Sequence, residues 1–176
     1  MFYSTQIEAE SIWLSQEETN HCKNVLRIKI GENVQVTNGK GNLYDCKLTD
    51  YTKKGAQLHI NNSNYYENNI SKNLHIGIAP TKSADRIEWF VEKAVEIGIG
   101  KISLVMMQHS ERKHISLERI NKVAISAMKQ SLQVYLPEID VFNDIKSFIK
   151  TVENYPVKIT AHLLQSLQNP INKVIN

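Results

Sequence analysis

The sequence predicts an α+β chain of two domains, a small antiparallel β barrel over residues 1–70 and an α/β domain over residues 71–176. In the first half, short runs of alternating apolar and polar residues are separated by turn sequences, which is typical of small antiparallel sheets. In the second half, strand-like runs alternate with amphipathic helical patterns, which is typical of a parallel sheet. Between the two, residues 61–69 are rich in asparagine and lack an apolar period, so we expect the tail of a strand followed by a linker.

Composition places the chain among ordinary globular proteins. Of its 176 residues, 41% are hydrophobic and 22% are charged, which argues against disorder. The net charge of +3 permits a nucleic-acid partner without requiring one. The two cysteines, Cys22 and Cys46, form no CxxC pair, and we expect them to be small core residues of a reduced, cytoplasmic protein. No signal-peptide pattern and no apolar run of membrane length is visible, so we expect no membrane partner.

The first half opens with a strand expected over residues 2–7. Ser15 and Glu18 then have the spacing of a capping box, in which Ser15 caps the Glu18 amide and the Glu18 side chain reaches back. This predicts a short helix over residues 16–26. Residues 38–41, Asn-Gly-Lys-Gly, are a strong hairpin signal between two alternating strands because glycine accepts a positive φ.

Basic residues gather in the same half of the chain: His21, Lys23, Arg27, Lys29 and Lys40. Phosphate contacts come mostly from such side chains, and several together bind RNA with an affinity that depends on salt. The residues alone leave two readings open, an RNA-binding face and the solvated face of an ordinary domain, and they favour the second.

The second half begins with two strand-like runs, residues 74–79 and 102–107, on either side of an amphipathic helix. Ser83 is a candidate N-cap, and Gly98 is a candidate C-cap glycine. Because the glycines at positions 98 and 100 close a helix, they are not a dinucleotide-binding loop, which must open one.

The remainder predicts a long helix that begins after Ser116, a short element near residues 145–152 and a last strand over residues 157–161. No His-Glu-x-x-His motif is present, which argues against a metal site. Ser110 lacks the flanking glycines of a nucleophile elbow, which argues against a serine hydrolase.

Polar loops follow both strands of the first strand–helix–strand unit. Lys82 and Arg86 come after the first strand, and Ser110, Glu111 and Arg112 come after the second. The carboxyl ends of parallel strands share one edge of a sheet, where α/β folds bind their ligands. We therefore expect these two loops to converge on one site.

Five motifs in register resemble the RsmE family, ribosomal RNA small-subunit methyltransferase E. They cover residues 21–31 with 38–41, 80–98, 110–112, 127–131 with 136–137, and 159–162. Any one of these motifs is weak evidence, but five in order along nearly the whole chain are strong.

The resemblance implies a PUA-like barrel joined to a SPOUT-type α/β domain that forms homodimers and binds S-adenosylmethionine in a trefoil knot. It implies methylation of uridine N3 in 16S rRNA of the small ribosomal subunit. The basic residues of the first half then become RNA-contact candidates, together with Lys82 and Arg86. Ser110, Glu111 and Gln130 are expected to border the active site, and Arg112 is our candidate for stabilising the uracil anion.

One part of the family pattern is not found in this sequence. The family has a Gly-Pro-Glu-Gly-Gly loop and a later Leu-Gly-x-Arg segment, which build the knot and most of the methyl-donor pocket, whereas residues 169–176 contain neither. We therefore expect an incomplete SPOUT domain, donor-binding residues beyond Asn176, and no activity or tight donor binding by these 176 residues alone. The alternative function is a non-catalytic RNA-binding protein or fragment without a donor pocket.

Overall fold

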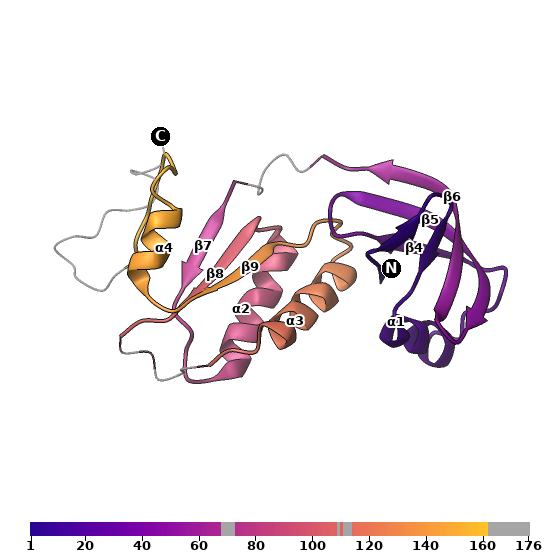
Figure 1. Cartoon of the computed structure of the whole chain (residues 1–176), viewed down its shortest axis with the longest axis horizontal. Coiled ribbons are helices and arrows are strands. Elements are labelled where there is room, and N and C mark those ends of the chain that lie inside the picture. Colours follow the sequence, from indigo (N-terminus) through magenta and orange to yellow (C-terminus); the bar gives the residue numbers. More distant parts are fainter. Residues whose placement is uncertain (68–72, 109, 111–113, 162–176) are drawn as a thin grey trace.

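The structure, a computed structural model, describes residues 1–67, 73–108, 110 and 114–161, which form two parts side by side (Figure 1). The elements of the N-terminal part are β1 Phe2–Tyr3, β2 Gln6–Glu8, β3 Ser11–Trp13, α1 Gln16–Asn20, the π-helical turn η1 His21–Val25, β4 Asn33–Thr37, β5 Asn42–Thr52 and β6 Gly55–Tyr65. The elements of the C-terminal part are β7 His75–Ile78, α2 Ala84–Ile97, β8 Lys101–Val105, α3 Leu117–Gln130, β9 Glu138–Phe142 and α4 Ile145–Thr151. The predicted α+β fold is confirmed; the boundary near residue 70 falls outside the described residues and stays a prediction.

The N-terminal sheet curls until its two edges meet. Its six strands run in the order β1-β4-β5-β6-β3-β2, antiparallel except for the parallel pair β1–β4. β1 and β2 lie at opposite edges, yet only Ser4 and Thr5 separate them in the chain. Buried Ser4 joins the edges, because its amide donates to the Thr37 carbonyl at 3.1 Å and its hydroxyl donates to the Trp13 carbonyl. The single strand predicted over residues 2–7 was therefore wrong: the chain bends at Ser4 to close the sheet.

The first helix begins where predicted, as α1, and continues as the π-helical turn η1. The Ser15 hydroxyl accepts from the Glu18 amide at 3.2 Å, as the capping box predicts. The second half of that box was wrong, because the Glu18 carboxylate instead accepts from Lys129 on α3. The helix continues as η1 to Val25, close to its predicted end.

The predicted hairpin and core cysteines are confirmed. Residues 38–41 join β4 to β5, with φ of +69° at Gly39 and +96° at Gly41. Cys22 and Cys46 are fully buried in the core of this sheet, and burial raises the pKa of Cys46 to about 12. Both thiols are therefore packing residues rather than nucleophiles.

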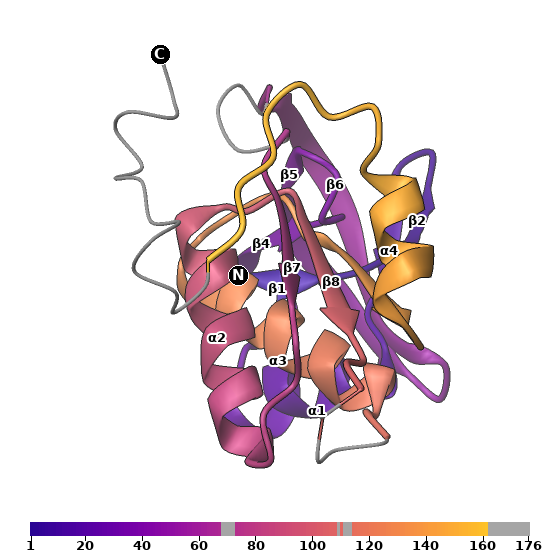
Figure 2. The ribbon, with the colours of Figure 1, turned by 90° about the vertical axis from the view of Figure 1, so that its left-hand side faces the viewer.

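The C-terminal sheet has three parallel strands in the order β7-β8-β9. α2 and α3 cover one face, and α4 packs on the other (Figure 2). As predicted, Ser116 caps α3 by accepting from the Arg119 amide at 3.3 Å, and Gly98 ends α2 with φ of +87°. The core between sheet and helices is apolar; its largest fully buried members are Val91, Val95, Ile102, Leu104 and Met128.

Two expectations about strands in this part were incomplete or wrong. β9 was not predicted, although Ile139 and Val141 alternate with acidic residues directly after Pro137. The strand predicted over residues 157–161 does not form: Val157 and Ile159 are 52% and 49% exposed. Alternation alone does not make a strand, because each strand also needs a neighbour to satisfy its backbone hydrogen bonds.

Candidate functional site

The carboxyl edge of the parallel sheet carries two of the predicted loops. Lys82 is exposed after β7, and Arg86 is exposed in the first turn of α2. After β8, the Ser110 hydroxyl accepts from the Met107 amide at 2.9 Å and the Ser110 amide donates to the Met107 carbonyl at 2.9 Å, which closes a turn.

Glu111 and Arg112 lie outside the described residues, so their proposed roles stay predictions. Arg119 on α3 and Glu88 on α2 form an ion pair with 2.7 Å between Nε and Oε1. This pair links the starts of the two helices.

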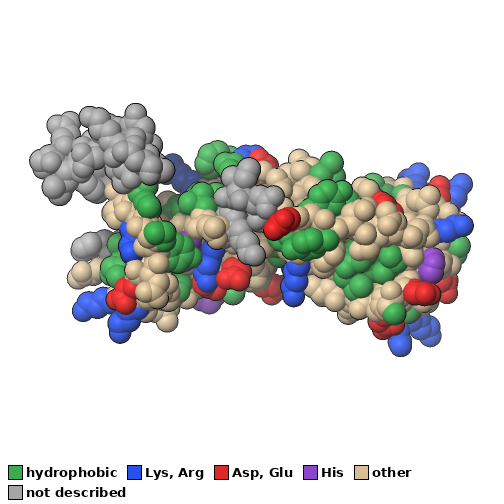
Figure 3. All heavy atoms as spheres, turned by 90° about the horizontal axis from the view of Figure 1, so that it is seen from above, with side chains coloured by type: hydrophobic (Ala, Val, Ile, Leu, Met, Phe, Trp, Pro, Cys, Tyr) green, Lys and Arg blue, Asp and Glu red, His purple; other side chains and the backbone are tan. Residues whose placement is uncertain are grey.

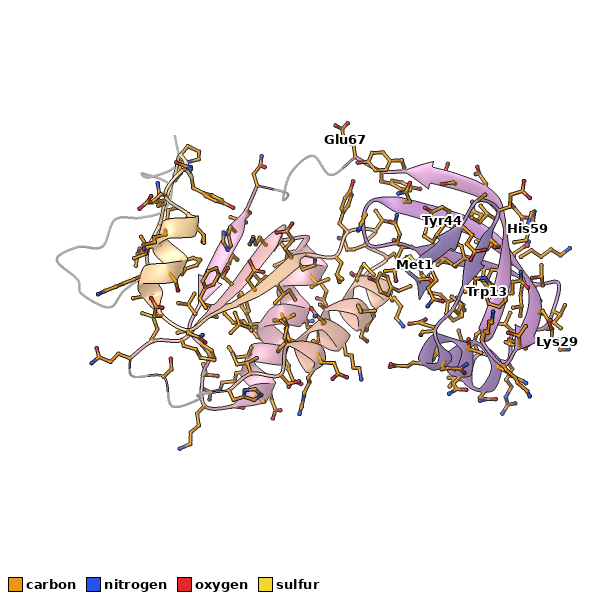
Figure 4. The ribbon with its side chains drawn as sticks, in the orientation of Figure 1. Met1, Trp13, Lys29, Tyr44, His59 and Glu67 are labelled. Atoms are coloured by element: carbon orange, nitrogen blue, oxygen red, sulfur yellow. The ribbon has the colours of Figure 1, made fainter. Side chains whose placement is uncertain are left out.

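Four of the predicted RNA-contact residues form one surface, the basic segment His21, Lys23, Arg27 and Lys29. All four are exposed, on η1 and the loop that follows it. The segment is anchored from below, because Tyr51 donates a hydrogen bond to the Ile28 carbonyl at 2.7 Å. Arg27 has φ of +57°, which turns the chain sharply at the exposed tip. Lys29 lies at the end of the molecule farthest from the parallel sheet (Figure 4).

Lys40 does not belong to the basic segment. It lies in the hairpin loop at the other end of β4, where it forms an isolated antiparallel bridge with Tyr135. Its neighbours Gly39 and Gly41 pair with the chain just after α3: the Gly41 amide donates to the Val134 carbonyl and the Leu136 amide donates to the Gly39 carbonyl, both at 2.9 Å. We call residues 134–136 the bridging segment, because they extend the N-terminal hairpin from the other part of the molecule.

An ion pair also joins the two parts. Glu18 on α1 is 7% exposed, and its Oε1 lies 2.5 Å from the Lys129 Nζ on α3. The other carboxylate oxygen of Glu18 is buried without a hydrogen-bond partner in the part of the chain that the structure describes. Lys129 is therefore committed to the contact between the parts rather than to a ligand. Sequence reasoning missed this pair, because 111 residues separate its members.

The predicted site residues do not all converge. The N-terminal part packs against the last turns of α3, whereas Lys82, Arg86 and Ser110 lie at the start of the helices. A helix of 14 residues spans about 20 Å, so α2 and α3 hold the two regions roughly that far apart. Gln130 lies at the far end of α3 from Ser110, although both were predicted to border one active site.

A groove of about 1150 Å³ separates the two parts at the amino-terminal edge of the parallel sheet. Its walls come from the hairpin loop, the end of β6, the start of β8 and the bridging segment. Five of the chain's seven tyrosines line it: Tyr3, Tyr65, Tyr66, Tyr135 and Tyr155. Seen from above, hydrophobic side chains are spread along the molecule between polar and charged ones (Figure 3). No local sequence pattern indicates this groove, because its lining residues run from Tyr3 to Tyr155.

The second face of the parallel sheet carries a polar cluster under α4. His75 Nε2 lies 2.7 Å from the buried Ser103 hydroxyl, and its Nδ1 is buried without a hydrogen-bond partner among the described residues. Burial and the nearby Lys101 charge lower the pKa of His75, against smaller opposing effects of Asp140 and Glu138. The Phe148 and Tyr155 rings pack on the imidazole, so this neutral histidine anchors α4.

The described residues offer neither a metal-binding cluster nor a membrane-spanning helix. They contain no group of three or more histidine, cysteine, aspartate or glutamate side chains arranged to hold a metal ion. None of the helices described is long and apolar enough to span a membrane.

Family comparisons agree with the two-part architecture. Residues 68–175 match the RNA methyltransferase domain, and residues 14–61 match the RNA methyltransferase PUA domain. The ribosomal RNA small subunit methyltransferase E of Buchnera aphidicola is 26% identical over 157 residues, which cover 85% of this chain and 61% of that protein. The chain thus spans about three fifths of the length of this curated relative.

Solved structures share the fold. A probable rRNA-methyltransferase from Porphyromonas gingivalis superposes with a TM-score of 0.84 at 32% identity, covering 95% of this chain and 70% of that one. A ribosomal RNA small subunit methyltransferase E from Neisseria gonorrhoeae, bound to S-adenosyl methionine, gives a TM-score of 0.73 at 21% identity, covering 96% of this chain and 74% of that one. At that identity the second likeness supports the fold alone.

Proposed function

We propose that this chain, which belongs to the RNA methyltransferase family, serves in the transfer of a methyl group from S-adenosylmethionine to ribosomal RNA. The observation that carries the proposal is the paired match: an RNA methyltransferase PUA domain over residues 14–61 is followed by an RNA methyltransferase domain over residues 68–175. At the finer level we propose uridine N3 of 16S rRNA as the target and the cytoplasm as the place of action, as the resemblance to the RsmE family implies.

The chemistry asks two things of the protein. Uridine N3 must be positioned in line with the methyl group, and the negative charge that appears on the uracil ring when N3 loses its proton must be stabilised. Arg112 stays our candidate for the second task, because it carries a permanent positive charge in the loop after β8. Ser110 and Glu111, its neighbours in that loop, are proposed to border the target nucleotide.

The described polar side chains at the carboxyl edge take part in a local turn and a helix cap. The Ser110 hydroxyl already accepts from Met107, and the Asp144 carboxylate already accepts from the Ser147 amide at 2.8 Å. Methyl-donor residues therefore stay unassigned within these ranges. The donor itself would supply an electrophilic methyl group on a sulfonium sulfur.

RNA binding is proposed to use the basic segment together with Lys82 and Arg86. The two surfaces lie at opposite ends of one chain, so a homodimer, which the resemblance implies, would let the basic segment of one copy approach the carboxyl edge of the other. Sedimentation of the purified chain at micromolar concentration tests the assembly, and a monomer at all concentrations contradicts it.

The activity is tested with small ribosomal subunits that lack the modification. The chain, and a longer version that includes a Gly-Pro-Glu-Gly-Gly segment if the coding sequence continues into one, are incubated with radiolabelled S-adenosylmethionine and the subunits. We expect N3-methyluridine in 16S rRNA from the longer version and none from the 176 residues alone. Labelling at another base or on 23S rRNA contradicts the finer proposal, and no labelling of any RNA contradicts the coarser one.

Binding of the donor is measured separately. We expect titration calorimetry of the 176-residue chain with S-adenosylmethionine to give weak or no binding. Micromolar binding would mean that these residues build a donor pocket of their own. The Arg112→Ala variant of an active version should lose turnover while keeping donor affinity, and an unchanged rate would remove Arg112 from the mechanism.

A further inference from the structure

We infer that the groove between the two parts binds an extended, single-stranded segment of RNA, with unpaired bases stacked on Tyr65 and Tyr66. The inference rests on the proposed function for the class of ligand, but its site is new. None of the residues that carry it belongs to the basic segment or to the carboxyl edge.

The size of the groove suits an extended ligand. Sites for small molecules usually enclose about 300–1,000 Å³, whereas this open groove measures about 1150 Å³. Its walls come from both parts, so a bound strand would touch the hairpin loop and the bridging segment at once. Glu67, at the end of β6, lies over the space between the two parts (Figure 4).

Two tyrosines present their rings to solvent there. Tyr65 is 66% exposed and Tyr66 is 49% exposed, so both side chains are accessible to a ligand in the groove. Unpaired bases stack on such rings whatever their identity, because every base has a π face. Tyr65 ends β6 and Tyr66 follows it, and both line the groove; we call these two residues the platform.

The platform is held in place before any ligand arrives. The Tyr135 hydroxyl donates to the Tyr66 carbonyl at 2.6 Å and lies 3.2 Å from the Tyr65 hydroxyl. Gly41 makes this approach possible, because a Cβ there would lie 2.2 Å from the Tyr135 hydroxyl and 2.9 Å from the Tyr65 ring. The backbone of Tyr66 and the Tyr65 ring over Gly41 are fixed in this way, so little conformational freedom is lost there on binding and more of the stacking energy appears as affinity.

The groove differs from the basic segment in its balance of charges. Lys40 and Lys101 are balanced by Glu67 and Glu138, and Lys101 is paired with Glu138 at 3.1 Å and Asp140 at 2.8 Å. Phosphate neutralisation therefore contributes little here, and stacking supplies most of the affinity. Binding to the groove should depend weakly on salt, whereas binding to the basic segment should depend on it strongly.

Fluorescence anisotropy with a labelled single-stranded RNA of twelve nucleotides, measured at two salt concentrations, tests the site in the full chain. We expect the double variant Tyr65→Ala, Tyr66→Ala to weaken binding by about tenfold or more, with an unchanged salt dependence. The matched double variant Tyr65→Phe, Tyr66→Phe keeps both rings and should bind within about twofold of the parent. The Lys23→Ala, Lys29→Ala variant should instead reduce the salt dependence.

Three results would overturn the inference. They are an alanine double variant that binds like the parent, phenylalanine and alanine variants that lose affinity equally, and a parent chain that binds no RNA. Thermal unfolding of each variant verifies that the loss is not a loss of fold. Failure of methyl transfer by a longer version, with tyrosine-dependent RNA binding retained, would contradict the proposed function and leave this site standing.

Discussion

The two sheets of this molecule differ in how their edge strands are covered. The N-terminal sheet brings its two edges together at Ser4, which donates hydrogen bonds to Thr37 of β4 and to Trp13 of β3. The parallel sheet leaves the outer sides of β7 and β9 without a strand partner among the described residues, and a short helix packs on its second face. The difference teaches that the edges of the N-terminal sheet meet within that sheet. The stability of the C-terminal sheet depends more on the elements that pack against it.

The largest expected effect tests whether the two cores are separate. Leu58 and Leu104 are both fully buried, one in each core, so Leu58→Ala and Leu104→Ala should each lower the free energy of unfolding by about 2–5 kcal/mol. We expect each variant to speed amide hydrogen exchange in its own sheet and to spare the other. Equal loss of protection in both sheets would show that the molecule unfolds as one unit.

The ion pair between the parts should rank second. Lys129→Ala leaves the buried Glu18 carboxylate without its cation, and we expect a loss of about 2 kcal/mol in the free energy of unfolding. The control is Lys122→Ala on the same helix, which removes the exposed pair with Glu118 and should change the stability much less. Denaturant titration of both variants makes the comparison, and similar losses would argue against a special role for Lys129.

Ser4→Ala tests how firmly the N-terminal sheet is closed. The variant leaves the Trp13 carbonyl without its donor in a buried place, which should cost about 1–2 kcal/mol. The control is Ser63→Ala, at an exposed position near the end of β6, which should be nearly neutral. Thermal unfolding measures both, and a neutral Ser4→Ala would mean that the edges are held by packing alone.

The smallest effect concerns pH and the second face of the parallel sheet. Because the pKa of His75 is lowered in the folded chain, the unfolded chain takes up a proton first as pH falls through about 6.5. The stability of the C-terminal part should therefore fall below that pH and level off once the folded histidine is also protonated. Urea titrations at pH 7.5 and 5.5 should show a smaller drop for His75→Gln than for the parent. An equal drop in His75→Gln and in the parent would contradict this prediction.

Local signals in the sequence predicted most of the fold. The hairpin at residues 38–41, the caps at Ser15 and Ser116 and the glycine at position 98 each act over a few residues, so they can be read without the tertiary structure. The break between β1 and β2 at Ser4 could not be predicted in this way, because it depends on hydrogen bonds to the distant carbonyls of Trp13 and Thr37. The segment 157–161 shows the same limit: its residues alternate as in a strand, but no neighbouring strand among the described residues pairs with it, so no strand forms.

The candidate site was predictable in its parts but not in its arrangement. The basic segment was readable because its members lie within nine residues of chain. The separation of Gln130 from Ser110 is set by α3, which begins at Leu117 on the side of Ser110 and ends at Gln130, whereas the motifs alone assign both residues to one site. The groove was the hardest to foresee, since Tyr65 and Tyr135 meet only through the contact of the hairpin with the bridging segment.

The bridging segment is translated long after the hairpin loop that it contacts. The Thr37 hydroxyl donates to the Val134 carbonyl across 97 residues of chain, which a ribosome adding about 5–20 residues per second needs roughly 5–20 s to make. The hairpin loop can hold its shape through that delay, because the Asn38 side chain accepts from the amides of Lys40 and Asn42 at 2.8 and 3.2 Å. The N-terminal sheet can therefore fold while the rest of the chain is still being translated, and its loop offers the later segment a surface already in place.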